Sequence, residues 1–308
     1  MSAHKLSVIF MGTPDFSVPC LDLLFHHPQI KITQVVSMPD RPAGRGQELK
    51  SPEVIEFAKK NSLSYLQTTN INKENLFLEN LKQNPPDMII VLAFAQFLGK
   101  TILHSAKIGC FNIHTSLLPR YRGAAPIHYA LLNGDKETGV SIQKMVKQMD
   151  AGDIVISHKL NIYPFETTSL LYTRLKYAAA LSLAELIDRA LSHNLHYTSQ
   201  DESLVSFAPT LQKNDGAINF NQSFEMIHNQ VRALQPWPGT FCELDNITIK
   251  VFEVEKITML SPNQLTHKCA DGYIRLKSIQ LPGKKITTDI ELLRGYRGDK
   301  IITSGIKQ

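Results

Sequence analysis

The sequence predicts an α/β protein in which an open, mostly parallel, Rossmann-like sheet is followed by a smaller β-rich domain. Three observations support this prediction. Strand-like and helix-like stretches alternate over the first half of the chain, residues 88–93 form an apolar run of strand length, and short β-branched runs follow residue 207. Alternating strands and helices build a parallel sheet with helices on both faces, whereas successive short strands build a small barrel or sandwich.

The elements expected in the first half follow its apolar periodicity. Strands are expected at 6–10, 31–37, 88–93, 110–114, 140–145 and 154–160, and helices at 16–26, 51–60, 72–83, 126–132 and 168–193. The helix at 51–60 has Ser51 as its cap, Pro52 at its first position and then an acidic residue, a common helix start. Residues 88–93 are apolar throughout, as expected of a parallel strand that is covered on both faces.

The length of 308 residues suits two domains of ordinary size. Apolar residues make up 43% of the chain and charged residues 20%, which excludes disordered, collagen-like and coiled-coil chains. We expect a first, catalytic domain at 1–193, a polar linker at 194–207 and a second domain at 208–308. The second domain is expected to hold a helix at 224–233 and strands at 247–254 and 273–279.

Several features predict a cytoplasmic protein. No apolar run approaches the roughly 18 residues that a membrane-spanning helix needs, and the first residues lack the apolar segment of a signal peptide. The four cysteines lie far apart with no Cys-x-x-Cys pair, so we expect reduced thiols and no metal site. We expect no membrane contact, and we take a monomer as the default state.

The basic excess of the chain lies at its C-terminal end. Residues 260–308 hold nine basic and four acidic residues, a difference equal to the net charge of +5 for the whole chain. Such asymmetry is typical of a domain that binds a polyanion. A basic solvent-facing surface with no polyanion partner explains this observation equally well.

The first turn does not fit a nucleotide cofactor. A dinucleotide-binding domain has Gly-x-Gly-x-x-Gly after its first strand, whereas this chain has Gly12-Thr13-Pro14-Asp15-Phe16. Pro14 lacks the backbone N–H that would bind phosphate, and Asp15 adds a negative charge beside it. The phosphate-binding pattern Gly-x-x-x-x-Gly-Lys-Ser/Thr is also missing from the sequence. Nucleotide cofactors are therefore not expected.

A candidate catalytic group lies at the end of the strand expected at 110–114. Asn112 and His114 are two residues apart, so they share a face of this strand, at the carboxyl end where open α/β sheets bind ligands. An amide and an imidazole side by side both donate to a developing oxyanion. We expect Asp150, from a loop between two later strands, beside His114, where it would orient the ring. Asp153 is an alternative that spacing does not exclude.

Several segments resemble the folate-dependent formyltransferases. The central ones are Asn112-x-His114 followed by Ser-Leu-Leu-Pro, and the block at 139–145 that leads to Asp150-x-Gly-Asp. Within the family the likeness is strongest to the methionyl-tRNA formyltransferases, through further segments at 10–16, 39–46, 117–127 and 236–238. The likeness extends from residue 6 into the C-terminal domain, and several segments in one order are more specific than any one of them.

The resemblance implies a formyltransferase fold with an OB-like C-terminal barrel. It also implies transfer of a formyl group from 10-formyltetrahydrofolate, without a metal, to the α-amine of initiator methionyl-tRNA, for translation initiation. In the family's mechanism, Asn112 and His114 would stabilise the tetrahedral intermediate and Asp150 would support His114. Folate contacts are implied for four residues of the next loop, Ser116, Leu117, Leu118 and Pro119. The strand end at 92–97 is a further candidate, from topology alone.

The arginine-containing segment at 39–46 is expected to bind tRNA. It holds Arg41 and Arg45 among Pro, Ala and Gly with no apolar anchor, the composition of a mobile, exposed loop. By resemblance, this loop contacts the acceptor end of the tRNA, and Arg45 matches the critical arginine of the family. The basic C-terminal domain would then bind tRNA phosphates without reading their sequence.

Other functions remain open on the sequence alone. A formyltransferase acting on a small amine, such as a purine precursor or an amino-sugar nucleotide, needs neither an arginine loop nor a basic domain. A hydrolase that removes formyl groups would use the same three residues. A non-catalytic RNA-binding protein would leave those residues unused, and an NAD-dependent dehydrogenase would need the missing glycine pattern.

Overall fold

The computed structural model describes residues 5–43, 46, 48–296, 298, 302–303 and 305. The chain divides into two compact units, each made of three stretches. Unit 1 comprises Met1–Gly123, Gly139–Leu160 and Tyr172–Phe207, and unit 2 comprises Ala124–Thr138, Asn161–Leu171 and Ala208–Gln308. Two stretches from the middle of the chain therefore belong with the C-terminal residues. The functional division expected at 194–207 stays a prediction.

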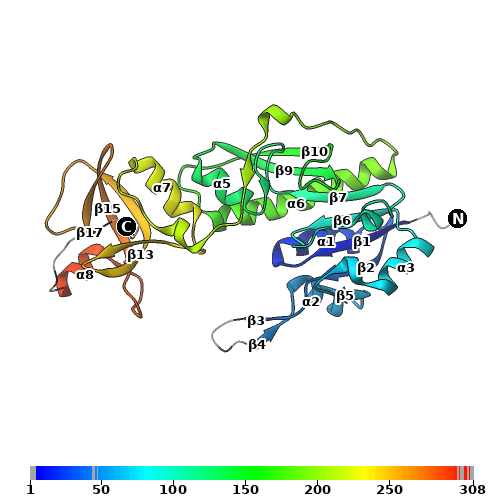
Figure 1. Cartoon of the computed structure of the whole chain (residues 1–308), viewed down its shortest axis with the longest axis horizontal. Helices are drawn as coiled ribbons and strands as arrows, with labels where there is room; N and C mark the ends of the chain where they lie inside the picture. Colours follow the sequence, from blue (N-terminus) through cyan, green and yellow to red (C-terminus); the bar gives the residue numbers. More distant parts are fainter. Residues whose placement is uncertain are drawn as a thin grey trace. The chain divides into compact units, whose positions relative to one another are not determined.

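A mostly parallel sheet forms the centre of unit 1 (Figure 1). In the described part of the chain its strands are β1 (Leu6–Gly12), β2 (Ile30–Ser37), β5 (Tyr65–Gln67), β6 (Met88–Leu92), β7 (Gly109–His114), β9 (Glu137–Lys144) and β10 (Ile154–Asn161). They lie in the order β10-β9-β7-β6-β1-β2-β5. Strand β1 pairs in parallel with β2 and β6, and β6 with β7, whereas β7 and β9 are antiparallel. The predicted sheet is confirmed.

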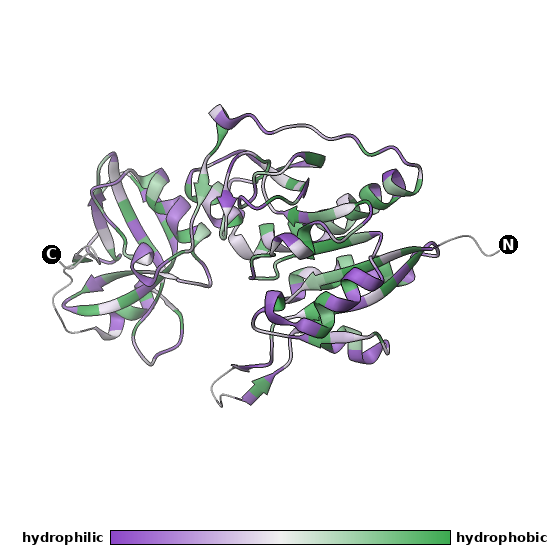
Figure 2. Ribbon diagram, turned by 45° about the vertical axis from the view of Figure 1, so that its right-hand side comes forward, coloured by the Kyte–Doolittle hydropathy of each residue, from purple (hydrophilic) through white to green (hydrophobic). Residues whose placement is uncertain are grey.

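Helices pack on this sheet because its central strands are apolar on both faces. They are α1 (Val18–His26), α2 (Glu53–Lys60), α3 (Asn75–Gln83), α4 (Lys100–Leu103) and most of α6 (Thr168–Leu191). All five residues of β6 are buried, as expected of a parallel strand covered on both sides. Phe77 and Leu81 of α3 pack with Val91 of β6. Figure 2 shows hydrophobic residues along the central strands and hydrophilic ones on the outer helix faces.

Three helix starts differ from the predicted ones. The stretch predicted as a helix at 16–26 begins with a 3₁₀ turn, η1 (Asp15–Ser17), before α1. Ser51 does not cap α2, because its hydroxyl donates to Asp40 Oδ1 at 2.9 Å. The stretch predicted as one helix at 72–83 begins with a 3₁₀ turn, η2 (Ile71–Lys73), before α3. The Asn70 side chain caps this turn by accepting the backbone N–H two residues on. Short polar side chains bind nearby backbone groups in ways that apolar periodicity does not reveal.

The described part of the arginine-containing segment belongs to a hairpin of two short strands, where a mobile, exposed loop was expected at 39–46. Strands β3 (Arg41–Ala43) and β4 (Glu48–Lys50) pair antiparallel, with Arg41 opposite Lys50, and both residues are exposed. The Pro and Gly content of this segment suggested a loop, but proline is tolerated in an exposed edge strand. Arg45, the other predicted tRNA contact, lies outside the described residues.

A barrel-like antiparallel sheet forms the core of unit 2. Its described strands are β12 (Thr240–Leu244), β13 (Ile247–Ile257), β14 (Thr266–Cys269), β15 (Gly272–Gln280), β16 (Thr287–Thr288) and β17 (Ile302–Thr303). The order is β14-β15-β13-β12-β17, with β16 paired to β15. Asp245 and Asn246 adopt φ of 51° and 61° in the two-residue turn between β12 and β13, a turn that such residues favour. The predicted small barrel is confirmed.

The helices of unit 2 come from two of its three stretches. They are α5 (Pro126–Leu132), α7 (Phe224–Ala233) and α8 (Asp289–Gly295), and α7 has the predicted bounds. Arg232 of α7 is buried, and its Nη1 donates to Glu166 O at 3.1 Å. The Thr168 hydroxyl donates to Ala233 O. These hydrogen bonds join α7 to the stretch Asn161–Leu171, so unit 2 is built from chain segments far apart in sequence.

The remaining elements that the structure describes are short. They are β8 (Arg122–Gly123), β11 (Phe207–Ala208), and the 3₁₀ turns η1 (Asp15–Ser17), η3 (Glu202–Leu204) and η4 (Lys213–Gly216). Among the helices that the structure describes, none has the length and apolar character needed to span a bilayer.

A buried ion pair stabilises the barrel. Asp289 is fully buried, and its carboxylate accepts two hydrogen bonds of 2.9 Å from Arg275 and one of 3.1 Å from Leu265 N–H. Burial raises the pKa of Asp289, but the hydrogen bonds from Arg275 and Leu265 outweigh it and hold the pKa below its ordinary value of 3.8. The ionised pair therefore stabilises the fold above that pH, and this contribution is lost as the pH falls through the folded-state pKa.

We predict that Asp289→Ala lowers the free energy of unfolding by about 3 kcal/mol at pH 7, because it leaves a largely buried guanidinium without its main partner. The difference from the wild type should shrink as the pH falls below about 4. Urea unfolding over this pH range measures both effects. As a control, Glu253→Ala removes the exposed partner of Lys277 and should cost under about 1 kcal/mol. Equal losses of unfolding free energy in the two variants would contradict the conclusion that the buried ion pair stabilises the barrel.

Candidate active site

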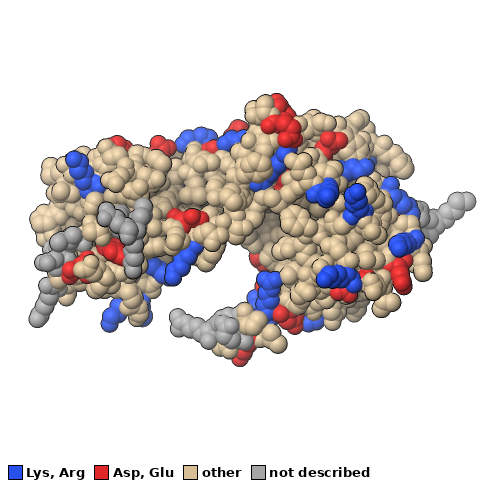
Figure 3. Space-filling view, in the orientation of Figure 1, with Lys and Arg blue, Asp and Glu red and all other residues tan. Residues whose placement is uncertain are grey.

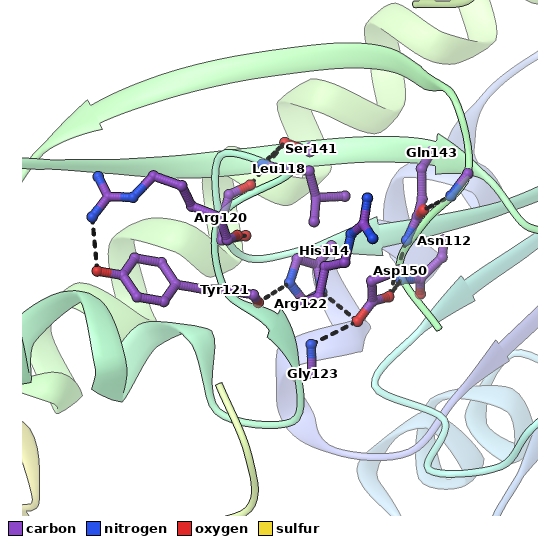
Figure 4. A network of polar contacts seen from close by, with 12 residues as sticks. Asn112, His114, Leu118, Arg120, Tyr121, Arg122, Gly123, Ser141, Gln143 and Asp150 are labelled. Carbon is purple, nitrogen blue, oxygen red and sulfur yellow. Dashed lines mark hydrogen bonds and ion pairs between the residues drawn. The ribbon is translucent and has the colours of Figure 1, made fainter. Parts of the chain in front are cut away.

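Asn112 and His114 lie at the carboxyl end of β7, which ends at His114. Their side chains share a face because residues two apart in a strand point the same way. The antiparallel pairing of β7 with β9 places Gln143 opposite Asn112 and Ser141 opposite His114. Four polar side chains therefore lie together in a part of the sheet that is otherwise apolar (Figure 4).

Asp150 lies in the loop between β9 and β10, and its carboxylate contacts both β7 side chains. Oδ2 is 3.7 Å from His114 Nδ1, and Oδ1 accepts a hydrogen bond of 3.3 Å from Asn112 Nδ2. The His114 and Asp150 side chains are only 7% and 11% exposed. The structure thus brings the three predicted residues together. The alternative, Asp153, is exposed, and its Oδ1 accepts from Ser199 Oγ at 3.0 Å.

Two further donors hold the Asp150 carboxylate. Gly123 N–H donates to Oδ2 at 2.9 Å, and Gln143 Nε2 donates to Oδ1 at 3.0 Å. The same Gln143 side chain accepts from Gly152 N–H at 2.8 Å. A Cβ on Gly152 would lie 1.8 Å from Lys144 O, so this loop packs directly against the backbone of β9. An ionised carboxylate only accepts hydrogen bonds, and these partners all donate.

The backbone of Tyr121 sets the proton position on His114. Nε2 lies 2.8 Å from Tyr121 O, and a carbonyl oxygen only accepts, so Nε2 carries a proton. The other ring nitrogen, Nδ1, lies on the Asp150 side. It accepts a hydrogen bond in the neutral ring and donates one in the imidazolium. Tyr121 has φ of +62°, a left-handed conformation that is uncommon outside glycine.

The loop after β7 contains the four predicted folate contacts, Ser116, Leu117, Leu118 and Pro119. Ser141 of β9 links two backbone groups of this loop. Its hydroxyl accepts a hydrogen bond from Leu118 N–H at 3.0 Å and donates one to Ser116 O at 2.8 Å. The Ser116 hydroxyl donates to Arg120 O at 2.6 Å. The peptide bond before Pro119 is cis. The loop is thus held next to His114 by two hydrogen bonds to Ser141 of β9 and by one of its own, and its binding role stays a prediction.

The other folate candidate, residues 92–97, follows β6, the strand beside β7. Ala93 and Ala95 adopt left-handed φ of 51° and 62°. Gln96 anchors the segment, since its Oε1 accepts from Ile71 N–H at 2.8 Å and its Nε2 donates to Thr68 O at 2.7 Å. The two candidate segments therefore leave the sheet at the ends of adjacent parallel strands.

Arg41 is not brought into contact with the catalytic group. It lies on β3, in the hairpin that projects from the sheet of unit 1 in Figure 1. In the described ranges, no group of three or more His, Cys, Asp or Glu side chains has the arrangement of a metal site.

Sequence reasoning missed the residues that support the catalytic group. The sequence held a signal for Ser141 and Gln143, because they alternate with apolar residues in β9. The structure buries both side chains, at 0% and 2% exposure. Polar side chains on one face of a buried strand require partners there. Tyr121 and Gly123 act through backbone atoms, which no pattern of side chains reveals.

Comparisons with known proteins identify the family of the chain. A family model described as formyl transferase matches residues 4–187, and one described as formyl transferase, C-terminal domain, matches residues 210–297. The chain belongs to the formyltransferase family. As the sequence predicts, it is an enzyme that transfers one-carbon groups.

Relatives of this formyltransferase match it along nearly its whole length. Methionyl-tRNA formyltransferases from Geobacter metallireducens and Syntrophus aciditrophicus are 37% and 38% identical over 301 and 304 residues. Each alignment covers 95% of this chain, and 96% and 97% of the respective relative.

Solved formyltransferase structures share the fold. An N-formyltransferase from Helicobacter canadensis, solved with folinic acid and dTDP-3-aminofucose, aligns with a TM-score of 0.67 at 19% identity, covering 88% of this chain and 98% of its own. A sugar 3N-formyltransferase, solved with dTDP and 5-N-formyl-THF, aligns at 0.66 and 21% identity, covering 92% and 100%. The predicted formyltransferase fold is confirmed.

We predict that Gly152→Ala lowers the free energy of unfolding by at least about 3 kcal/mol, because the added Cβ would overlap a backbone oxygen of β9. Urea unfolding measures the loss. Gly295→Ala is the matched control, since a Cβ there has no heavy atom within 4 Å, and its stability should stay near that of the wild type. A Gly152→Ala protein as stable as wild type would show that the loop does not pack on β9.

Proposed function

We propose that this formyltransferase transfers the formyl group of 10-formyltetrahydrofolate to the α-amino group of initiator methionyl-tRNA. Relatives named methionyl-tRNA formyltransferase, 37% and 38% identical along 95% of the chain, support this pair of substrates. Neighbours solved with folates support the formyl donor. The observation that carries the chemistry is the convergence of Asn112, His114 and Asp150 at the end of β7.

Asn112 and His114 are proposed to stabilise the oxyanion of the tetrahedral intermediate. Attack of the α-amine on the formyl carbon moves negative charge onto the formyl oxygen. One N–H of the Asn112 amide binds Asp150, so the second is available to donate to this oxygen. Protonated His114 donates from Nδ1, since Nε2 is held by Tyr121 O. A preorganised donor of this kind supplies about 3 kcal/mol of transition-state stabilisation.

Asp150 is proposed to stabilise the imidazolium and to take up the proton that the attacking amine loses, directly or through water. The 3.7 Å between Oδ2 and His114 Nδ1 is too long for a hydrogen bond. The two groups therefore interact as charges and keep hydrogen-bonding capacity for the reacting atoms. The proton then passes to the folate nitrogen as the tetrahedral intermediate collapses and the bond between this nitrogen and the formyl carbon breaks.

The loop Ser116–Pro119 and residues 92–97 are proposed to hold the folate. They follow adjacent parallel strands, and such strand ends are where open α/β sheets bind ligands. Buried Leu118 lies beside His114 in Figure 4 and offers an apolar surface for a ring. The three polar side chains suit the formyl group of the folate. The Asn112 amide and the His114 imidazole are hydrogen-bond donors, and they lie together with the Asp150 carboxylate, which is an acceptor.

The tRNA is proposed to contact the hairpin through Arg41 and Arg45 and the C-terminal domain through scattered basic residues. Figure 3 shows Lys and Arg side chains interspersed with acidic ones on the face it draws. In the barrel, Arg275 and Lys277 are paired with acidic residues, whereas residues 284–285 are exposed lysines. Separate exposed lysines provide salt-dependent contacts to phosphates. Three further basic residues, Arg297, Lys300 and Lys307, lie outside the described residues.

The direct test of this function is to incubate the protein with 10-formyltetrahydrofolate and methionyl-tRNA and to measure formylmethionyl-tRNA. A dTDP-amino sugar in place of the tRNA tests the small-amine alternative. Product from the tRNA and none from the sugar supports the proposal. Formylation of the sugar alone, or hydrolysis of the folate without transfer, overturns it.

We predict that Asn112→Ala lowers kcat about 100-fold, because one oxyanion donor is lost. Asp150→Asn should stay folded and lose most activity, since the amide neither stabilises the imidazolium nor accepts the proton. Initial rates of tRNA formylation measure both. Asn84→Ala, which removes an exposed amide that bonds only locally to Asn80, serves as control and should have normal kcat. Near-normal turnover by Asp150→Asn would remove Asp150 from the mechanism.

We predict that Arg41→Ala and Arg45→Ala raise the KM for methionyl-tRNA several-fold, with a smaller salt dependence, because a phosphate contact is lost. The dissociation constant of the folate should stay unchanged. Steady-state kinetics at several salt concentrations and fluorescence titration of the folate test this. Lys31→Ala removes one exposed charge near the start of β2 and is the control. An equal loss of folate affinity would count against separate binding of the two substrates.

A further inference from the structure

The segment expected to be a linker, residues 194–207, contacts the catalytic loop. Thr198 exchanges two backbone hydrogen bonds with Ile154, of 2.8 and 2.9 Å. Beyond it, Gln200 Nε2 donates to Asp150 O at 2.9 Å and to Gly152 O at 2.7 Å. The Gln200 amide thus binds two backbone carbonyl groups of the loop that carries the Asp150 carboxylate.

The other end of the Gln200 amide is held by a buried arginine. Arg122 is 1% exposed, and its Nε and Nη2 donate to Gln200 Oε1 at 3.1 and 2.8 Å. The same guanidinium binds Glu202, with hydrogen bonds of 2.7 and 3.3 Å. The hydrogen bond from Arg122 lowers the pKa of Glu202 below its ordinary value. The arginine is therefore fixed by two partners from the segment, and it in turn fixes the orientation of the Gln200 amide.

Arg122 lies between the two residues whose backbones define the site. Tyr121 O binds His114, and Gly123 N–H binds Asp150. The segment also holds this stretch directly, because Tyr121 N–H donates to Ser206 Oγ at 3.0 Å and Arg122 N–H donates to Ser206 O at 2.9 Å. Residues 198–206 therefore connect the backbone that orients His114 with the loop that carries Asp150.

We propose that Gln200 is a positioning residue for formyl transfer. Oriented by Arg122, it keeps the Asp150 loop in the correct position relative to His114. This inference rests on the proposed function of Asp150 and adds a residue that does not touch the substrates. Only an amide performs the role, because it must accept from Arg122 at one atom and donate to two carbonyls at the other. A shift of about 1 Å in a catalytic group costs up to about 100-fold in rate.

The variant Gln200→Glu separates positioning from stability. A glutamate keeps an acceptor for Arg122 and gains an ion pair with it, but it cannot donate to Asp150 O and Gly152 O. We expect kcat for methionyl-tRNA formylation to fall about 10- to 100-fold, with the KM for both substrates within about threefold of wild type. A residue that served only to hold Arg122 for the fold would show normal kcat in this variant.

The matched control is Gln235→Glu in unit 2. Gln235 Nε2 also donates to two backbone carbonyls, of Val231 at 3.0 Å and Phe252 at 2.8 Å. We expect its loss of thermal stability to resemble that of Gln200→Glu, while its kcat stays within about twofold of wild type. An equal fall of kcat in the two variants would overturn the inference, because the effect would then follow stability alone.

Wild type and Asp150→Asn, assayed in parallel, separate the inference from the proposed function. Normal kcat in Gln200→Glu, with an active wild type and an inactive Asp150→Asn, overturns the inference and leaves the function standing. A wild type that forms no formylmethionyl-tRNA overturns the function, and the inference with it. If Gln200→Glu does not fold, Gln200→Asn replaces it: its amide is one carbon too short to bridge the same atoms, so kcat should fall at least threefold. Wild-type kcat in that variant overturns the inference.

Discussion

The site depends on a nearly buried carboxylate held at the end of β7. A charge in such a place needs hydrogen-bond donors to replace water, and the fold supplies them to Asp150 from β7, from β9 and from the stretch at 121–123. Each donor comes from a different chain segment. The geometry of the candidate site therefore depends on the local packing, because a segment that shifts removes a hydrogen-bond donor from the Asp150 carboxylate and changes its distance to His114.

The sheet and the two candidate catalytic side chains of β7 were predictable from the sequence because both follow strand periodicity. Residues 88–93 are apolar without interruption, and Asn112 and His114 are two apart in a short strand. Loop geometry was not predictable in the same way. Asp150 and Asp153 are equivalent by spacing. Only the folded loop, in which Asp150 has a φ of +52° and its carboxylate contacts Asn112, distinguishes them.

Long-range polar contacts were the least visible part of the structure. Gln200 lies 50 residues from Asp150 and 78 from Arg122 in the chain, within a polar stretch whose composition is that of a solvated linker. A buried arginine is equally hard to foresee, since Arg122 stands among residues typical of a turn. Arg122 is buried because Gln200 and Glu202 accept its hydrogen bonds, and these partners come together only in the folded chain.

Unit 2 is built from three separate stretches of the chain, and this limits where the gene can recombine with those of its relatives. Arg232 and Ala233 of α7 bond to carbonyl and hydroxyl oxygens of the stretch Asn161–Leu171, which precedes them by more than sixty residues. A hybrid with one crossover at residue 208 would join an α7 from one parent to this stretch from another. Exchange that preserves the packing must carry all three stretches of unit 2 together, although they are not contiguous in the gene.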